Sequence, residues 1–149
     1  KKIRSKMKPV LSDLYQEELL AYADAVKQFS RLQNPTGTGT AVSRSCGSSV
    51  TVDLIVQKGF ITDIGLEVDA CALGSASSAI VAEKVIGKTL DEISTLGCSI
   101  WSMLRSGGSI PGGDWRNFKF LAPAKSLENR HQSICLIFDA IEKAGSTLK

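Results

Sequence analysis

Two runs of alternating apolar and polar residues, at 50–57 and 60–68, constrain the fold of this chain more than any other feature. In both runs the even-numbered positions are mostly apolar, and Lys58-Gly59 lies between the runs. A two-residue connection containing glycine between alternating runs predicts an antiparallel β-hairpin. One face of this hairpin, which includes Phe60, is largely apolar, so we expect helices to cover it.

The rest of the chain shows helical periods separated by turn residues. We expect a helix over 11–32, with Ser12 and Asp13 as candidate caps, followed by a loop at 34–39. The further elements predicted are a short strand at 41–45, a helix at 73–86, a helix at 90–104 opened by a Thr89–Glu92 capping box, a glycine-rich loop at 107–113 and a last helix at about 130–144. This order predicts a single α+β domain over 1–149, with a small antiparallel sheet of about three strands packed against helices and a disordered basic tail at 1–10.

The distribution of charge and hydropathy limits the partners that we expect. Five of the positive charges lie in the first eight residues, so the rest of the chain has a slight negative excess despite the formal net charge of +3. A basic tail on such a body is weak evidence for nucleic-acid binding, and we interpret it as a frayed terminus. No apolar run approaches the roughly 18 residues needed to span a membrane, and we read no secretion signal. We therefore expect a cytoplasmic protein with reduced thiols and with no nucleic-acid or membrane partner.

Cys46 and Cys71 each lie in a run of small residues. Cys46 comes directly before the first alternating run, and Cys71 directly before the helix at 73–86, so one chain reversal can bring the two together. A thiol at a helix N-terminus is favoured as the thiolate, the form that binds metals and attacks persulfides. The pair predicts a half-exposed metal or sulfur site, although Cys71 alone could equally be a small core residue.

The last helix contains two more candidate ligands. His131 is the only histidine of the chain, and Cys135 lies four residues later on the same helical face. A histidine at this place is either a metal ligand or a surface or capping residue. Cys135 precedes three apolar residues and Cys98 lies among apolar residues of its helix, so we expect both cysteines in the core.

The segments around the first cysteine pair resemble a known family. Residues 71–78 and 85–92 are similar to the second-cysteine segment of NifU/IscU-type iron–sulfur cluster scaffolds. Asn34-Pro35 resembles the Asn-Pro that follows the first helix of these scaffolds, and Cys46-Gly47 before 49–54 resembles their first-cysteine segment. The resemblance implies an α+β scaffold that receives iron and sulfur on three cysteines, holds a [2Fe–2S] cluster and passes it to acceptor proteins.

The resemblance covers about residues 11–92 and returns at 139–141 in the last helix. The family has an aspartate two residues after its first cysteine, and this chain has Ser48 there. With the last helix anchored on 139–141, the third cysteine of the family falls on Ser133. The arginine that precedes this cysteine in SufU-like members then matches Arg130.

Only Cys46 and Cys71 therefore remain from the three cysteines that the resemblance implies. A serine hydroxyl is a poorer ligand for soft metals than a thiolate, so zinc or a cluster would need other ligands to complete its coordination. His131 is the predicted third ligand, and Cys135 takes this place if the register is shifted by two residues.

Three functions remain open. The first is a scaffold or carrier for a [2Fe–2S] cluster or iron. The second is a zinc-containing sulfur relay of SufU type that accepts persulfide from a cysteine desulfurase, and the third is a degenerate scaffold that only binds assembly partners. None of these is an enzyme, and the sequence has no catalytic Ser/His/Asp spacing or phosphate loop. We expect a monomer or weak homodimer, and the loop at 106–116 is either a partner contact or a plain surface loop.

Overall fold

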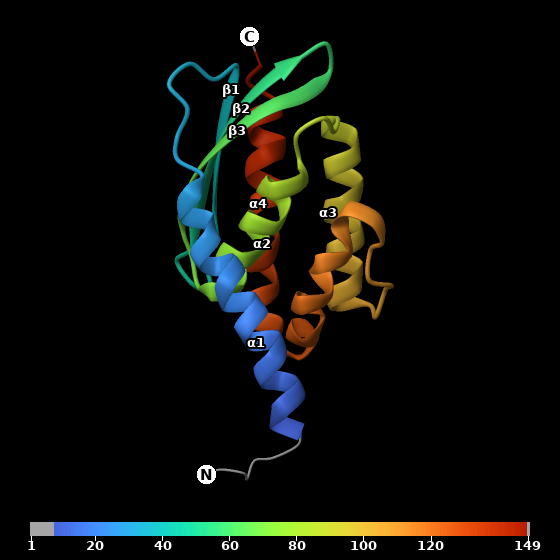
Figure 1. Ribbon diagram of the computed structural model, residues 1–149. Helices are drawn as coiled ribbons and strands as arrows, with labels where there is room; N and C mark the ends of the chain where they lie inside the picture. Colours follow the sequence, from blue (N-terminus) through green and yellow to red (C-terminus); the bar gives the residue numbers. More distant parts are fainter. Residues whose placement is uncertain (1–7, 149) are drawn as a thin grey trace.

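The computed structural model describes residues 8–148 and has an α+β architecture (Figure 1). In chain order its elements are α1 (Lys8–Ala25), the short 3-10 helix η1 (Val26–Gln28), β1 (Gly37–Val42), β2 (Ser49–Gln57), β3 (Phe60–Asp69), α2 (Ala72–Lys84), α3 (Leu90–Arg105), the 3-10 segments η2 (Gly113–Ser126) and η3 (Glu128–Arg130), and α4 (His131–Gly145). The strands form one antiparallel sheet in the order β1-β2-β3. The predicted small three-stranded sheet packed against helices is confirmed.

The hairpin of β2 and β3 forms where the alternation predicts it, but its register changes near the turn. Residues 58–59 have φ values of 55° and 86°, which the tight hairpin turn requires. The strand pairing shifts between Ile55 and Val56, and such an irregularity exchanges the faces of the residues beyond it. As a result Ile61 is fully buried and Phe60 is 49% exposed, so the prediction that Phe60 belongs to the apolar face is wrong.

Strand β1 begins at Gly37, within the segment that was predicted to be a loop. Glycine is a poor strand former, but here α4 passes directly over the strand. A Cβ atom on Gly39 would lie 2.3 Å from the Ala144 nitrogen and 2.5 Å from the Ala140 carbonyl oxygen. The glycines of β1 therefore allow the helix backbone to approach the sheet, and the prediction of a loop at 34–39 is wrong from Gly37 onward.

Helix α1 differs from its prediction at both ends. It already contains residues 8–10, predicted to be part of a tail, and it begins before the two predicted caps, Ser12 and Asp13. Residues 1–7 of the predicted tail lie outside the described residues. At the other end the helix stops at Ala25 and Phe29 is extended, with φ −103° and ψ 92°. The predicted helix to residue 32 is therefore too long.

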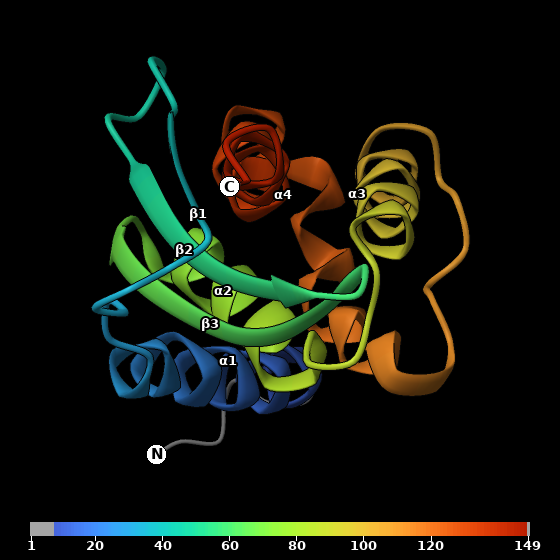
Figure 2. The same ribbon diagram turned by 90° about the horizontal axis from the view of Figure 1, so that it is seen from above.

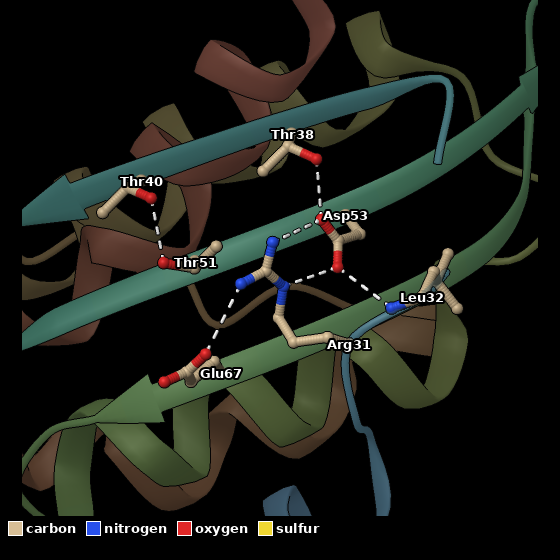
Figure 3. Close-up of polar contacts among 7 residues, drawn as sticks. All are labelled: Arg31, Leu32, Thr38, Thr40, Thr51, Asp53 and Glu67. Atoms are coloured by element: carbon tan, nitrogen blue, oxygen red, sulfur yellow. Dashed lines mark hydrogen bonds and ion pairs between the residues drawn. The ribbon is translucent and has the colours of Figure 1, made fainter. Parts of the chain in front are cut away.

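The early end of this helix follows from a polar network around Asp53, on the face of β2 opposite its core residues (Figure 3). Arg31 Nε and Nη2 donate to the carboxylate at 2.6 and 3.1 Å, the Leu32 N–H donates at 3.0 Å, and Thr38 Oγ1 donates at 2.7 Å. Burial acts to raise the pKa of Asp53, but these hydrogen bonds and the Arg31 charge outweigh it and hold the pKa below its usual value. The chain leaves the helix because Arg31 and Leu32 bind this buried carboxylate.

The helices form layers on the other face of the sheet. Helix α4 lies against β1 and β2, α3 packs on the outer side of α4, and α2 lies between α4 and α1 (Figure 2). The Thr89–Glu92 capping box at the start of α3 is confirmed, as is the last helix, whereas the 3-10 segment η2 was not predicted. None of the helices over residues 8–148 is both long and apolar enough to cross a membrane.

Candidate metal and sulfur site

Three chain segments meet at the end of the molecule where α2 and α4 begin (Figure 1). The first is the connection between β1 and β2, which carries Cys46. It is a closed turn, because the Ser43 N–H donates to the Ser48 carbonyl oxygen and the Gly47 N–H donates to the Ser43 carbonyl oxygen, both at 2.8 Å. Gly47 has a φ of 74°, which glycine adopts at little cost. The turn holds Cys46 at the tip of the sheet.

The Cys46 sulfur lies among serine hydroxyl groups. Its thiol donates to Ser43 Oγ at 3.3 Å, and its sulfur lies 3.1 Å from Ser48 Oγ. Hydroxyl groups can rotate to donate to a thiolate. The hydrogen bond with Ser43, followed by those with Ser48 and Ser133, lowers the pKa of Cys46 to about 7, although burial acts to raise it. Cys46 is therefore a thiol that ionises near neutral pH, as expected of a metal ligand or a nucleophile.

Cys71 occupies the N-cap position of α2, as predicted, but its side chain makes no capping hydrogen bond. Its sulfur lies instead 3.6 Å from Ser133 Oγ, in the first turn of α4. Ser133 Oγ in turn donates to Ser48 Oγ at 3.2 Å. A continuous series of contacts thus runs from Cys46 through Ser48 and Ser133 to Cys71, and it brings the two thiols to one site.

The small residues that follow Cys71 serve packing between α2 and α4. A Cβ atom on Gly74 would lie 2.6 Å from Ser133 Oγ, so only glycine leaves room for this hydroxyl. One turn further on, Ser77 is fully buried and its Oγ donates to the Ile134 carbonyl oxygen at 2.6 Å. The small-residue run therefore permits the close helix contact that carries Ser133 to the thiols.

The recorded contacts of His131 are with η2 and α3. His131 is 1% exposed, its Nε2 lies 2.9 Å from the Ala124 carbonyl oxygen, and its ring packs edge-on against Trp101. Its buried Nδ1 has no hydrogen-bond partner among the described residues. Arg130 ends η3 and is half-buried. His131 is thus a buried residue that ties α4 to η2, not the surface or capping residue considered from the sequence.

Cys98 and Cys135 line an opening of about 440 Å³ between α3 and α4. Cys135 is buried, and this burial raises its pKa to about 12, as expected for a core thiol. Cys98 is exposed, so the prediction that it belongs to the core is wrong. It lies on the flank of α3 that faces the opening, whereas Ile93, Leu96 and Ile100 form the buried stripe of the helix.

The donors at the site are two thiols and the hydroxyls of serine residues. Among the side chains that the structure describes, no three from His, Cys, Asp or Glu are grouped so that they could hold a metal ion. The two thiols fit zinc or the iron of a cluster, because both metals favour thiolate ligands. The Ser133 hydroxyl beside Cys71 is a weaker donor for such metals than a thiolate. The chain itself therefore offers an incomplete set of soft ligands.

Sequence reasoning missed two residues that contact this site. Ser43 was seen only as part of a strand, although its side chain is fully buried against Cys46. Gln132 was not singled out, yet its Oε1 accepts a hydrogen bond from Ser43 Oγ at 3.0 Å. The excess of serine around Cys46 was the available signal, but the partner on α4 is distant in sequence and had no local signal.

Comparison with known proteins finds one family model that matches residues 14–109, described as the NifU-like N terminal domain. The iron–sulfur cluster assembly scaffold protein IscU of Thermotoga maritima is 27% identical over 135 residues, which cover 91% of this chain and 94% of that protein. A crystal structure of the N-terminal part of a NifU-like protein from Brucella abortus aligns with a TM-score of 0.85 and 36% identity, covering 92% of this chain and 95% of that one. The structure of a putative SUF-system scaffold from Fervidobacterium islandicum, 23% identical with a TM-score of 0.76 over 86% of this chain and 93% of that one, shares the fold.

Proposed function

This chain belongs to the NifU-like N-terminal domain family of iron–sulfur cluster assembly scaffolds, and we propose that it receives iron and sulfur on Cys46 and Cys71 and passes a [2Fe–2S] cluster to acceptor proteins. The observation that supports this most is the series of contacts that joins the two thiols through Ser48 and Ser133. Such a protein carries its cargo without catalysing turnover. Its reduced thiols suit the cytoplasm.

The incomplete ligand set fits a carrier that binds its cargo transiently. Each iron of a [2Fe–2S] cluster is held by two thiolates in ordinary all-cysteine sites, and this chain contributes one such pair. The other positions would be filled from outside the site, by a small thiol, a second copy of the chain or the acceptor protein. Weak retention of the cluster then favours its transfer.

A second candidate function is supported by the low pKa of Cys46. In a sulfur relay the Cys46 thiolate would attack the terminal sulfur of a persulfide on a cysteine desulfurase. A new S–S bond to Cys46 would form, and the desulfurase cysteine would leave as its thiolate, so no electrons are gained or lost. Zinc held by the two thiols would make this the zinc-containing relay. The third candidate, a module that only binds assembly partners, requires neither thiol.

Anaerobic reconstitution with ferric iron and sulfide separates these functions. A scaffold would gain the visible absorption of a cluster, and Cys46→Ala or Cys71→Ala would abolish it. Cys98→Ala is the matched control, because its thiol is exposed but lies outside the site. A relay would show no stable cluster, but it would hold zinc and stimulate a cysteine desulfurase through Cys46. Absence of both activities, with partner binding intact in both alanine variants, would contradict the scaffold and the relay.

A further inference from the structure

Helix α4 holds the Cys46 turn at two points through consecutive residues. Ser133 Oγ donates to Ser48 Oγ at the end of the turn. Gln132 Oε1 accepts hydrogen bonds from Ser43 Oγ at 3.0 Å and from Ser45 Oγ at 3.4 Å at its start. Ser43 and Ser48 are buried, so α4 is hydrogen-bonded to a buried residue at each end of the turn.

The middle of the turn has little other support. Arg44, Ser45 and Gly47 are exposed, so few packing contacts restrict where the turn places Cys46. The backbone hydrogen bonds of the turn fix its shape, but they do not fix its position relative to α2 and α4. The contacts with Gln132 and Ser133 are those that tie the turn to the helix beside Cys71.

Gln132 also orients the hydroxyl that the Cys46 thiol contacts. The Ser43 hydroxyl has one hydrogen, and it is donated to Gln132 Oε1. While Cys46 is protonated, the lone pairs of Ser43 Oγ are then free to accept from its thiol at 3.3 Å. When the thiol ionises, the Ser43 hydroxyl can rotate to donate to the thiolate. Gln132 is thus linked to Cys46 through one buried side chain.

We propose that Gln132 is a positioning residue, which with Ser133 clamps the Cys46 turn onto α4 and thereby sets the separation of the Cys46 and Cys71 thiols. The proposal rests on the proposed function in that these two thiols are the site. It concerns their geometry in the free protein, so it is tested without any metal or cluster. A partner or metal that binds both thiols would then find them at a separation that the free protein has already set.

Cross-linking with dibromobimane, which joins two nearby thiols, tests this spacing. The measurement is the fraction of modified protein in which Cys46 and Cys71 are joined, in a Cys98→Ser background and located by peptide mass spectrometry. Gln132→Met keeps the length of the side chain but removes the acceptor, and Gln132→Glu keeps an acceptor oxygen. Gln57→Met, at the exposed end of β2, is the matched control. Thermal unfolding of each variant reports whether the fold is retained.

We expect Gln132→Met to lower the joined fraction by about threefold to tenfold, the effect of losing one or two hydrogen bonds. Gln132→Glu should remain within about twofold of the parent, since hydrogen bonds to a carboxylate are at least as strong, and Gln57→Met should change nothing. An unchanged joined fraction in folded Gln132→Met would overturn the proposal. So would a loss in Gln132→Glu as large as that in Gln132→Met. If Gln132→Met lowers the joined fraction as expected but the parent protein assembles no cluster, the positioning role of Gln132 stands. Only the proposed function is then contradicted.

Discussion

At the scale of single residues, hydroxyl groups decide how Cys46 behaves. Ser43 and Ser48 contact its sulfur and lower its pKa to about 7. Since the thiolate is the nucleophile, alkylation of Cys46 in metal-free protein should accelerate with rising pH and reach half of its maximal rate near pH 7. Ser43→Ala removes the largest stabilising contact and should move this midpoint to higher pH. Rates measured for the Cys46 peptide by mass spectrometry test both expectations.

Cys135 supplies the internal comparison for this pH profile. Its pKa is raised to about 12 by burial, so it should stay unmodified throughout the neutral range. A Cys46 midpoint that is unchanged in Ser43→Ala would show that the Ser43 hydroxyl does not stabilise the thiolate. A midpoint near 8.5, the ordinary value for cysteine, would contradict the hydroxyl effect as a whole.

Ser133 is the residue whose change should strengthen metal binding. Its Oγ lies 3.6 Å from the Cys71 sulfur and 3.2 Å from Ser48 Oγ, so a thiol at this position would join the two present. We expect Ser133→Cys to tighten zinc binding by about tenfold or more, because zinc prefers thiolate to hydroxyl ligands. Competition with a chromophoric chelator measures the affinity.

Ser99→Cys, which adds a thiol at an exposed position of α3, is the control for this substitution. It should leave the affinity of the Cys46–Cys71 site unchanged. If instead Cys135→Ala abolished binding and Ser133→Cys had no effect, the third ligand position would belong to Cys135 and the assignment to Ser133 would be wrong.

At the scale of elements, Asp53 connects the segment after α1 to the central strand. Its carboxylate is fully buried and accepts from Arg31, Leu32 and Thr38. Asp53→Asn should destabilise the fold by about 1–3 kcal/mol in urea unfolding, since charged hydrogen bonds are lost at a buried position. Glu67→Gln removes the second, exposed partner of the same Arg31 and should cost less than about 1 kcal/mol.

The same carboxylate gives the stability a defined pH dependence. The folded pKa of Asp53 lies below its unfolded value, so its contribution is complete above the unfolded pKa of about 3.9. It is lost as the pH falls through the lower folded pKa. Asp53→Asn should remove this part of the acid dependence. Equal losses of stability for Asp53→Asn and Glu67→Gln would contradict the importance of the buried network.

The alternation of β2 and β3 and the capping box of α3 are local signals, and the structure has both elements. The failures arise where tertiary contacts override local preference. Gly37 and Gly39 suggest a loop, but they belong to strand β1. Helix α4 packs so close to this strand that a side chain at either position would clash with the helix backbone. Arg31, just after α1, binds Asp53, which lies 22 residues later in the sequence. The helical periodicity of the first segment carries no signal of this contact.

The candidate site shows the same division between local and distant signals. Cys71 at the start of α2 follows from the sequence, because the change of period marks the helix start. The contact of Ser133 with Cys71 required a register for α4, which only the family resemblance supplied. The exposure of Cys98 and the burial of His131 depend on how α3 and η2 pack on α4, and the sequence carries no local signal for this packing.

At the scale of the whole molecule, the site exists only in the complete fold. Its residues come from the β1–β2 turn, the start of α2 and the start of α4, which are joined only through the sheet and the helix layer. The site faces outward at one end of the molecule with two thiols rather than four. Completion of a four-thiolate cluster must therefore involve groups that the site does not contain.

Reconstitution at different protein and glutathione concentrations should reveal where these groups come from. With a small thiol as the outside ligand, cluster yield should rise with glutathione and not with protein concentration, and the loaded protein should sediment as a monomer. Ser133→Cys should reduce the requirement for glutathione, because it supplies one more thiolate next to Cys71. A yield that rises with protein concentration, together with a cluster-linked dimer in analytical ultracentrifugation, would instead identify a second copy as the source of the missing ligands. A cluster that forms equally well in dilute protein without added thiol would contradict the two-thiol site itself.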